Sequence, residues 1–323
     1  MSLRSAAGSP GTQAQLSSTP VDVTVATHYW QGYRFFSRVR HSASPQTEPI
    51  VLIGGAFQRK EQWGRLESEL ASFADVVTVD LPGWGAADTL PSRYGTNWLA
   101  EATAQLLYDL DLPEVNLFGG SYGSAIAYQV AGRYPHLVRR TILLGATTRL
   151  PGQLQERAEK TLRLLESGDR DAFARDAVSS VLASPPGTVI TRGRAVERLL
   201  TQLFSSLQEE DIAKYRANTM RLFRGELINL ESSPPQPTLV VTGEHDRLTP
   251  PAEGRLTAQS CQQAWFTSIK DCNHMLHLQR TTDFAELIRR FVTQTASQLD
   301  ATDSAPQSFQ SMECVRECQS SAL

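Results

Sequence analysis

Residues 115–133 of this 323-residue chain read VNLFGGSYGSAIAYQVAGR. The apolar run at 115–118 is typical of a strand buried on both faces, and the residues after Gly123 are typical of a helix. Between them, the segment GGSYG at 119–123 matches the Gly-x-Ser-x-Gly pattern. A serine in a sharp turn from strand to helix needs residues without side chains two positions before and after it. Ser121 is therefore the candidate nucleophile.

On both sides of this segment, short β-branched runs alternate with longer amphipathic stretches, which is the pattern of parallel strands joined by helices. The expected strands are the apolar runs at 49–53, 76–79, 115–118, 138–144, 238–242 and 264–269. The expected helices are at 62–73, at 97–110 behind a Thr96 cap, at 124–133 and at 282–293. Alternation at 21–40 around Gly32 predicts an antiparallel hairpin that opens the sheet. The sequence thus predicts an α/β fold with a mostly parallel sheet flanked by helices.

Residues 150–233 have a different pattern, with apolar side chains at helical spacing and no strand pattern. We interpret this range as a helical cap inserted into a core formed by 21–149 and 234–296. The prolines at 234, 235 and 237 end the cap, because proline cannot continue a helix. The ranges 1–20 and 297–323 show little apolar periodicity, so we expect disordered tails there.

A serine hydroxyl is a weak nucleophile near neutral pH and needs a histidine that accepts its proton. His274 follows the last expected strand and precedes the last expected helix, so its loop could bring the imidazole over Ser121. His277 is the alternative base, although we expect it on a helix surface. We expect the remaining histidines to be structural or solvated: His28, His41, His136 and His245.

A fixed carboxylate must orient such a histidine and stabilise its charged form. Asp246 is the candidate, because it lies in GEHDRLTP at 243–250, directly after an expected strand. Open α/β folds bind ligands at this carboxyl end of the sheet. Glu244 and Asp271 are alternatives, and a solvated loop charge also explains each of them.

Attack on a carbonyl creates an oxyanion, which backbone N–H donors must stabilise. Tyr122 follows the candidate nucleophile, so its backbone N–H is one candidate donor. The second is expected in the loop after the strand at 49–53, where Gly54 and Gly55 let the chain turn close to the substrate. We predict that Ala56 supplies it, although these glycines are also typical of a plain tight turn.

These motifs together resemble the α/β-hydrolase fold superfamily over about residues 21–293. They are Gly54-Gly55-Ala56 with Trp63, DLPGWG at 80–85, the Ser121 turn, the 243–250 segment and His274. The resemblance implies an eight-stranded, mostly parallel sheet, a helical cap between the sixth and seventh strands, and a Ser121-His274-Asp246 triad.

The chain departs from this superfamily at two places. Most relatives carry His-Gly where this chain has Gly54-Gly55, and glycine where it has Asn273. The segment GGSYGS at 119–124 is similar to prolyl iminopeptidases, but their His-Gly-Gly-Pro-Gly segment is missing. Epoxide hydrolases and dehalogenases that resemble this fold use an aspartate nucleophile at the position of Ser121.

The complete Ser121-His274-Asp246 set leads us to expect a serine hydrolase that cleaves a small-molecule carboxylic ester through an acyl-enzyme. The fold alone does not identify a substrate. Other interpretations are a thioesterase, a C–C hydrolase or another acyl-processing enzyme of a biosynthetic pathway, an aminopeptidase, and a non-catalytic ligand receptor. Cap residues Arg192, Arg194 and Arg198 could bind an acidic substrate or an acyl-carrier partner, although a solvated face also explains them.

Composition argues against several partners. A net charge of -3 and a pI near 6.1 provide no basic field of the kind that nucleic acid or an anionic membrane selects. Neither a membrane-spanning apolar run nor a signal-peptide centre is present, so we expect a cytoplasmic protein. The four cysteines are expected to be reduced, and Cys314 and Cys318 lack further ligands for a metal. We expect no cofactor and no metal, since the sequence has no ligand cluster and no phosphate-binding loop.

Overall fold

The computed structural model describes residues 23–148, 152–224, 227–229, 232–295, 298–299 and 313–315. The predicted N-terminal tail lies outside these ranges. Of the predicted C-terminal tail, only 298–299 and 313–315 lie within them.

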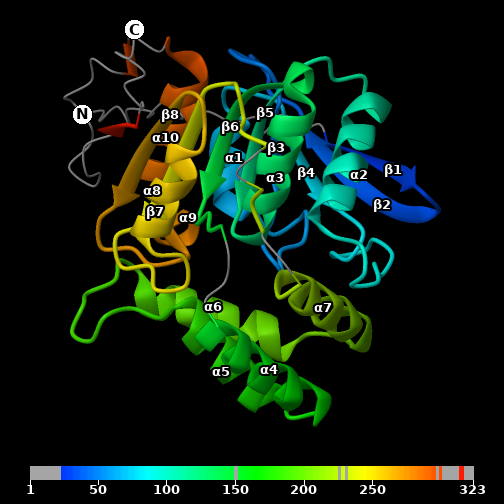
Figure 1. The fold of residues 1–323 in the computed structure, drawn as a ribbon, viewed down its shortest axis with the longest axis vertical. Coiled ribbons are helices and arrows are strands. Elements are labelled where there is room, and N and C mark those ends of the chain that lie inside the picture. The colour runs from blue at the N-terminus through cyan, green and yellow to red at the C-terminus, as the bar shows by residue number, and fades with distance from the viewer. Residues whose placement is uncertain are drawn as a thin grey trace, which may run out of the picture.

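One sheet runs through the described chain, in the order β1-β2-β4-β3-β5-β6-β7-β8-β9 (Figure 1). Its strands are β1 (Val23–Trp30), β2 (Tyr33–Arg40), β3 (Ile50–Ile53), β4 (Val76–Asp80), β5 (Val115–Gly120), β6 (Val138–Leu144), β7 (Thr238–Gly243), β8 (Ala264–Ile269) and β9 (Glu313–Cys314). Strands β3 to β8 pair in parallel, whereas β1–β2, β2–β4 and β8–β9 pair antiparallel. The expected eight-stranded, mostly parallel sheet is confirmed, and the two-residue β9 is added beside β8.

The predicted hairpin at the start of the sheet is also confirmed. Strands β1 and β2 pair from Val23↔Arg40 to Trp30↔Tyr33, so only two residues connect them. These two residues, Gln31 and Gly32, have φ values of 47° and 84°. Two consecutive positive φ values are typical of the tight turn whose twist matches paired antiparallel strands.

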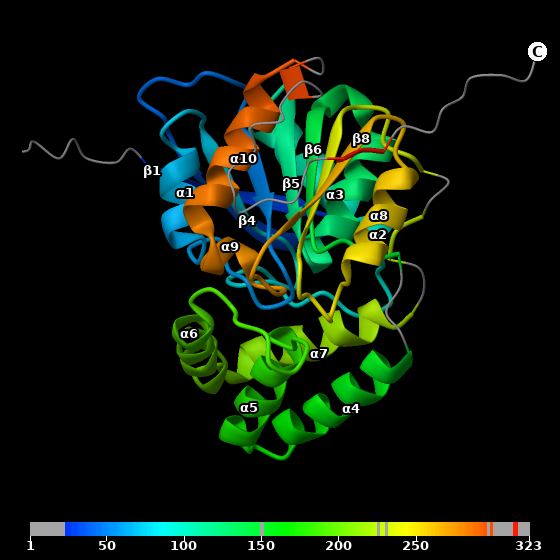
Figure 2. The same ribbon diagram turned by 90° about the vertical axis from the view of Figure 1, so that its left-hand side faces the viewer.

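Helices cover both faces of the sheet (Figure 2). One face carries α2 (Thr96–Asp109), α3 (Tyr122–Arg133) and α8 (Pro251–Gln259), and the other carries α1 (Gly64–Leu70) and α10 (Thr281–Thr293). The short helices η1 (Pro135–Leu137) and α9 (Leu276–Gln279) lie in connections. Strands between two helical layers lose solvent on both faces, and every residue of β3, β4, β5, β7 and β8 is buried.

The expected helix caps differ from the observed ones in one place. Gly95 is the N-cap residue of α2, and Thr96, the predicted cap, is the first residue of the helix itself. The Gly95 backbone is extended, with φ −88° and ψ −171°, which is the conformation that an N-cap residue adopts.

Four helices between β6 and β7 form a separate layer at the carboxyl end of the sheet (Figures 1 and 2). We call α4 (Gly152–Glu166), α5 (Arg170–Val181), α6 (Gly193–Ser205) and α7 (Glu209–Leu222) the cap helices. Phe173, Phe204 and Tyr215 form their buried centre. Phe57, from the loop after β3, packs into this centre, with its ring 4.1 Å from that of Tyr215.

Helix α7 is tied to the loop that follows β4. Lys214 Nζ donates to Gly85 O at 2.7 Å, and Asn218 Nδ2 donates to Gly83 O at 2.9 Å. Arg221 donates to the carbonyl oxygens of Tyr94 and Leu90. All three side chains are buried, and positions i, i+4 and i+7 share one helix face. Buried polar groups bonded in this way hold α7 in one register against the core.

Candidate active site

Ser121 occupies a strained turn between β5 and α3. Its φ is 52° and its ψ is −117°, a combination that non-glycine residues rarely adopt. A β-carbon on Gly119 would lie 2.3 Å from Gly123 O, and one on Gly123 would lie 2.3 Å from Ile53 O. The two glycines of the motif therefore have the steric role that the sequence predicted for them.

The structure brings Ser121, His274 and Asp246 together from three loops. His274 Nε2 lies 2.9 Å from Ser121 Oγ, and His274 Nδ1 lies 2.8 Å from Asp246 Oδ2. The loops follow β5, β7 and β8, whose carboxyl ends meet at one edge of the sheet. His274 and Asp246 are only 6% and 4% exposed, so water competes little for their hydrogen bonds.

Thr249 supports this arrangement and was not singled out from the sequence. Its Oγ1 donates to Asp246 Oδ2 at 2.7 Å and lies 3.1 Å from His274 Nδ1. The backbone N–H groups of Leu248 and Thr249 both donate to Asp246 Oδ1 at 2.9 Å. Three donors besides the histidine therefore fix the carboxylate. In the sequence, this role could have been inferred only from the presence of a threonine three positions after Asp246.

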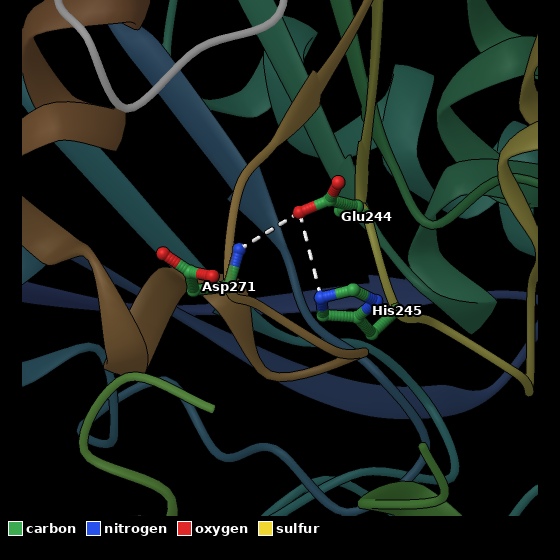
Figure 3. Close-up of side chains that lie close together, drawn as sticks. All are labelled: Glu244, His245 and Asp271. Carbon is green, nitrogen blue, oxygen red and sulfur yellow. Dashed lines mark hydrogen bonds and ion pairs between the residues drawn. The ribbon is translucent and has the colours of Figure 1, made fainter. Parts of the chain in front are cut away.

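The two alternative acids lie in a separate group beside this site. Glu244, His245 and Asp271 have ligand atoms within 4.8 Å of one another (Figure 3). Glu244 Oε2 accepts from the Asp271 backbone N–H at 3.1 Å and lies 3.5 Å from His245 Nε2. The Asp271 side chain is exposed, and its Oδ2 lies 3.3 Å from Arg280 Nη2. These local contacts account for the group, and we assign no metal to it.

His277, the alternative base, is not on a helix surface, and that expectation was wrong. It lies in α9, is 8% exposed and lines the cavity described below. Its Nδ1 is buried without a hydrogen-bond partner among the described residues. Burial, with a smaller contribution from nearby His274, lowers the pKa of His277 to about 4. The ring of Trp63, whose centroid lies 6.3 Å from that of His277, helps to bury the residue at this position.

The loop after β3 approaches Ser121 closely. Ile53 pairs with Gly119 in the parallel register of β3 and β5, so β5 extends only one residue beyond the end of β3. A β-carbon on Gly55 would lie 3.4 Å from Ser121 Cβ. Tyr122 is the first residue of α3, and the first N–H groups of a helix lack acceptors within the helix. The two predicted oxyanion donors, Ala56 and Tyr122, thus belong to segments that flank Ser121.

A cavity of about 700 Å³ lies between these loops and the cap helices, and Ser121 and His274 line it. Its volume falls within the range of small-molecule sites. Most of the side chains that the cap helices contribute are apolar. They include Leu154, Ala158, Leu199, Leu200, Leu203 and Phe204.

A second Ser-His-Asp set occurs in the described chain, away from this cavity. His28 Nε2 lies 2.8 Å from Ser37 Oγ, and His28 Nδ1 lies 3.0 Å from Asp109 Oδ2. Ser37 is fully buried in β2, its φ is not positive, and it does not line the cavity. Hydrogen-bond geometry alone therefore does not distinguish a nucleophile. Access to a cavity and the strained turn single out Ser121.

A family model described as the alpha/beta hydrolase fold matches residues 48–281. The chain belongs to the α/β-hydrolase fold family.

Known proteins similar to this α/β hydrolase include hydrolytic enzymes. It is 25% identical over 245 residues to pyrrolizixenacetamide deacetylase of Xenorhabdus hominickii, covering 75% of this chain and 90% of the relative. It is 28% identical over 254 residues to poly(3-hydroxyalkanoate) depolymerase of Ectopseudomonas oleovorans, covering 77% and 86%. The crystal structure of MGS-M2, an α/β hydrolase enzyme from a deep-sea metagenome library, superposes with a TM-score of 0.73 at 20% identity, covering 84% and 98%. The family match and the two curated relatives support a hydrolase, and the superposition supports the fold.

The two departures from the family pattern have structural counterparts in this α/β hydrolase. A β-carbon on Gly54 would lie 2.9 Å from Gln58 Cβ, so Gln58 fills the space beside that position. Asn273 Nδ2 donates to Leu182 O at 3.0 Å, and its Oδ1 accepts from Gln279 Nε2 at 2.8 Å. Asn273 thus ties the loop of His274 to the segment between α5 and α6.

Other groups noted in the sequence lie as follows in this α/β hydrolase. Of the three arginines singled out in the sequence, Arg192 lines the cavity and Arg194 and Arg198 do not, although all three are exposed. Burial raises the pKa of both Cys261 and Cys272 to about 12, which keeps these thiols protonated and unreactive. Cys318 lies outside the described residues. No helix among those described combines the length and the apolar character needed to cross a membrane.

Proposed function

We propose that this protein is a serine hydrolase that cleaves a carboxylic ester, or a related acyl bond, of an apolar small molecule. The observation that carries the proposal is the 2.9 Å contact between His274 Nε2 and Ser121 Oγ on the wall of a cavity. A neutral imidazole at this distance can accept the hydroxyl proton as the oxygen attacks.

In the acylation step, Ser121 Oγ forms a bond to the acyl carbon and its proton moves to His274 Nε2. The carbonyl electron pair moves onto the oxygen, which the backbone N–H groups of Ala56 and Tyr122 stabilise. Asp246 stabilises the imidazolium through the 2.8 Å hydrogen bond to Nδ1. Collapse of the intermediate breaks the bond to the leaving group, which takes the proton from Nε2 as it departs.

Water releases the acyl group in the second half of the reaction. His274 Nε2 accepts a proton from the water, whose oxygen attacks the acyl carbon of the ester on Ser121. The second tetrahedral intermediate uses the same oxyanion donors, and its collapse returns the proton to Ser121 Oγ. The free carboxylic acid and the original enzyme result, so the cycle needs no cofactor.

The cavity supports an apolar acyl or alcohol group as the substrate. Leu199, Leu203 and Phe204 lie on its cap side, and each apolar group that leaves water against them adds to binding. A deacetylase and a poly(3-hydroxyalkanoate) depolymerase are among the similar proteins, which supports hydrolysis of an acyl bond here. We infer that rates will rise with acyl chain length until the cavity is filled.

A substrate panel on wild type and Ser121→Ala tests the proposal. The panel comprises aryl esters of increasing acyl length, acyl thioesters and proline amides, and we expect the longer aryl esters to react fastest. Ser121→Ala should lose at least about 10⁴-fold in kcat, because the remaining site cannot form an acyl-enzyme. A fluorophosphonate should label Ser121 and leave Ser37 unlabelled in the same folded sample. Full activity of Ser121→Ala would refute the triad.

The same panel separates the other interpretations. Preference for thioesters over esters of equal chain length would indicate a thioesterase, and cleavage of proline amides would indicate a peptidase. A folded wild type that neither reacts with the panel nor takes up the fluorophosphonate would indicate a binding protein.

A further inference from the structure

Trp84 connects the two segments that carry the predicted oxyanion donors. It lies in the loop after β4 and is only 4% exposed. Its indole Nε1 donates a hydrogen bond of 2.8 Å to Gly55 O, in the loop after β3. Its ring also packs against that of Tyr122, with the centroids 5.1 Å apart. Gly55 immediately precedes Ala56, and Tyr122 immediately follows Ser121.

The hydrogen bond from Trp84 to Gly55 O fixes the direction of the Ala56 N–H as well as that of the Gly55 carbonyl. Gly55 C=O and Ala56 N–H belong to one peptide group, which is planar and trans, so the two bonds point in opposite directions. A donor that holds the carbonyl therefore also sets the direction of the Ala56 N–H. Acceptance of a hydrogen bond by the carbonyl further polarises the peptide and strengthens its N–H as a donor.

The Gly55–Ala56 peptide is held at two points. Gln58 N–H donates to the same carbonyl oxygen at 3.1 Å, in the turn that follows β3. That bond is local, since its partners are only three positions apart in the sequence. The bond from Trp84 comes from another strand connection, 29 residues away in sequence, and fixes the turn relative to the rest of the site.

Trp84 is itself fixed from the side of the cap helices. Asn218 donates to Gly83 O and Lys214 donates to Gly85 O, so α7 holds the carbonyl groups of the residues on both sides of Trp84. Arg221 Nη1 lies 3.4 Å from the hydroxyl of Tyr122. The indole N–H thus has little freedom to turn away from Gly55.

We propose that Trp84 is a positioning residue of the oxyanion hole, whose indole N–H orients the Ala56 N–H toward the oxyanion formed when Ser121 attacks. This inference rests on the proposed function, because the oxyanion exists only if Ser121 adds to a carbonyl. Trp84 does not contact the reacting atoms, and its contribution passes through the Gly55–Ala56 peptide.

The test is Trp84→Phe, which keeps an aromatic ring beside Tyr122 and removes the N–H. The matched control is Trp98→Phe, since Trp98 is buried in α2 and donates an indole hydrogen bond of 2.8 Å to Gln31, outside the site. Loss of a whole oxyanion donor costs roughly 10²–10³-fold in kcat, so a misdirected one should cost about 10–100-fold. We expect this loss in Trp84→Phe, with KM within about twofold, and no loss beyond about twofold in Trp98→Phe.

A second measurement separates positioning from a general structural role. An alkyl trifluoromethyl ketone adds to the serine and forms an adduct that carries an oxyanion. Its Ki should rise in Trp84→Phe by the same factor by which kcat/KM falls, because both depend on the oxyanion hole. If Trp84→Phe does not fold, incorporation of 3-benzothienylalanine at position 84 keeps the bicyclic shape without the N–H, and the same loss is expected.

The outcomes distinguish this inference from the proposed function. A wild type that is labelled at Ser121 and turns over esters, with kcat and Ki unchanged in the variants at position 84, would overturn the inference alone. Equal losses in Trp84→Phe and Trp98→Phe would also overturn it. A wild type without labelling and without turnover would overturn the proposed function and this inference with it.

Discussion

Gly123 and Ile53 approach so closely that a β-carbon on Gly123 would lie 2.3 Å from the Ile53 carbonyl oxygen. The start of α3 therefore lies directly against the end of β3, and Ser121 is held over the loop that carries Ala56. The atom on the other side of this contact is a backbone oxygen, so no flexible side chain can move aside for an added β-carbon.

We expect Gly123→Ala to destabilise the fold and impair the site together. The added methyl group must displace α3 or β3, at a cost of roughly 1–3 kcal/mol in the free energy of unfolding. Because Ser121 moves with α3, kcat should also fall by at least about tenfold. Urea unfolding and ester turnover measure the two effects. Gly193→Ala is the control, since a β-carbon on this first residue of α6 would come no closer than 3.4 Å to a neighbour, and a stability loss as large in this control would contradict the steric explanation.

Asp246→Asn should preserve the fold and abolish most of the activity. The amide can donate to His274 Nδ1, which would leave the proton on Nε2 and prevent it from accepting the Ser121 proton. We expect kcat to fall by about 10³–10⁴-fold, with KM little changed. Steady-state kinetics on an aryl ester measure the loss. Asp75→Asn, which removes a carboxylate 3.2 Å from His41 at an exposed site, should keep full activity. More than a tenth of wild-type kcat in Asp246→Asn would argue for another acid.

Ser37→Ala should affect stability and leave catalysis unchanged. The substitution removes the partner of His28 Nε2 in a fully buried position, and an unsatisfied buried group costs roughly 1–3 kcal/mol. Chemical unfolding should show this loss, while kcat should remain within about twofold of wild type. A large loss of turnover in a folded Ser37→Ala protein would show that the second Ser-His-Asp set contributes to activity.

His277 should make the protein less stable in mild acid. The pKa of His277 is about 4 in the folded protein, compared with an ordinary value of 6.5. Between about pH 6.5 and 4, the histidine therefore binds a proton in the unfolded chain but not in the folded protein. The free energy of unfolding therefore falls as pH decreases from about 6.5 to 4, by up to about 3 kcal/mol from this residue.

The variant His277→Leu keeps a buried side chain of similar size and cannot titrate. Urea unfolding of both proteins at several pH values between 7 and 4 measures the difference. The stability of His277→Leu relative to wild type should improve steadily as the pH decreases. Parallel stability curves for the two proteins would show that His277 does not carry this pH dependence.

The fold was largely predictable from local sequence. Buried parallel strands leave continuous apolar runs, and the hairpin at Gly32 leaves alternation around a turn residue, so both could be recognised without long-range information. The N-cap residue of α2 was harder to predict. Thr96 has the side chain of an N-cap residue, but the extended backbone of Gly95 decides where the helix begins. Strand β9 had no comparable signal in the sequence, because its two residues are too few to show a pattern.

The sequence by itself determined the turn that carries Ser121, because a serine held in a sharp turn between a strand and a helix requires glycines at fixed, nearby positions. It also determined the loops that carry His274 and Asp246. Only the tertiary structure places His274, and not His277, against Ser121. It likewise places Asp246, and neither Glu244 nor Asp271, against His274. Thr249 and Trp84 likewise emerged only there. Ser121 and His274 are 153 residues apart, and such contacts depend on how the strands are ordered and the helices packed, which no local pattern records.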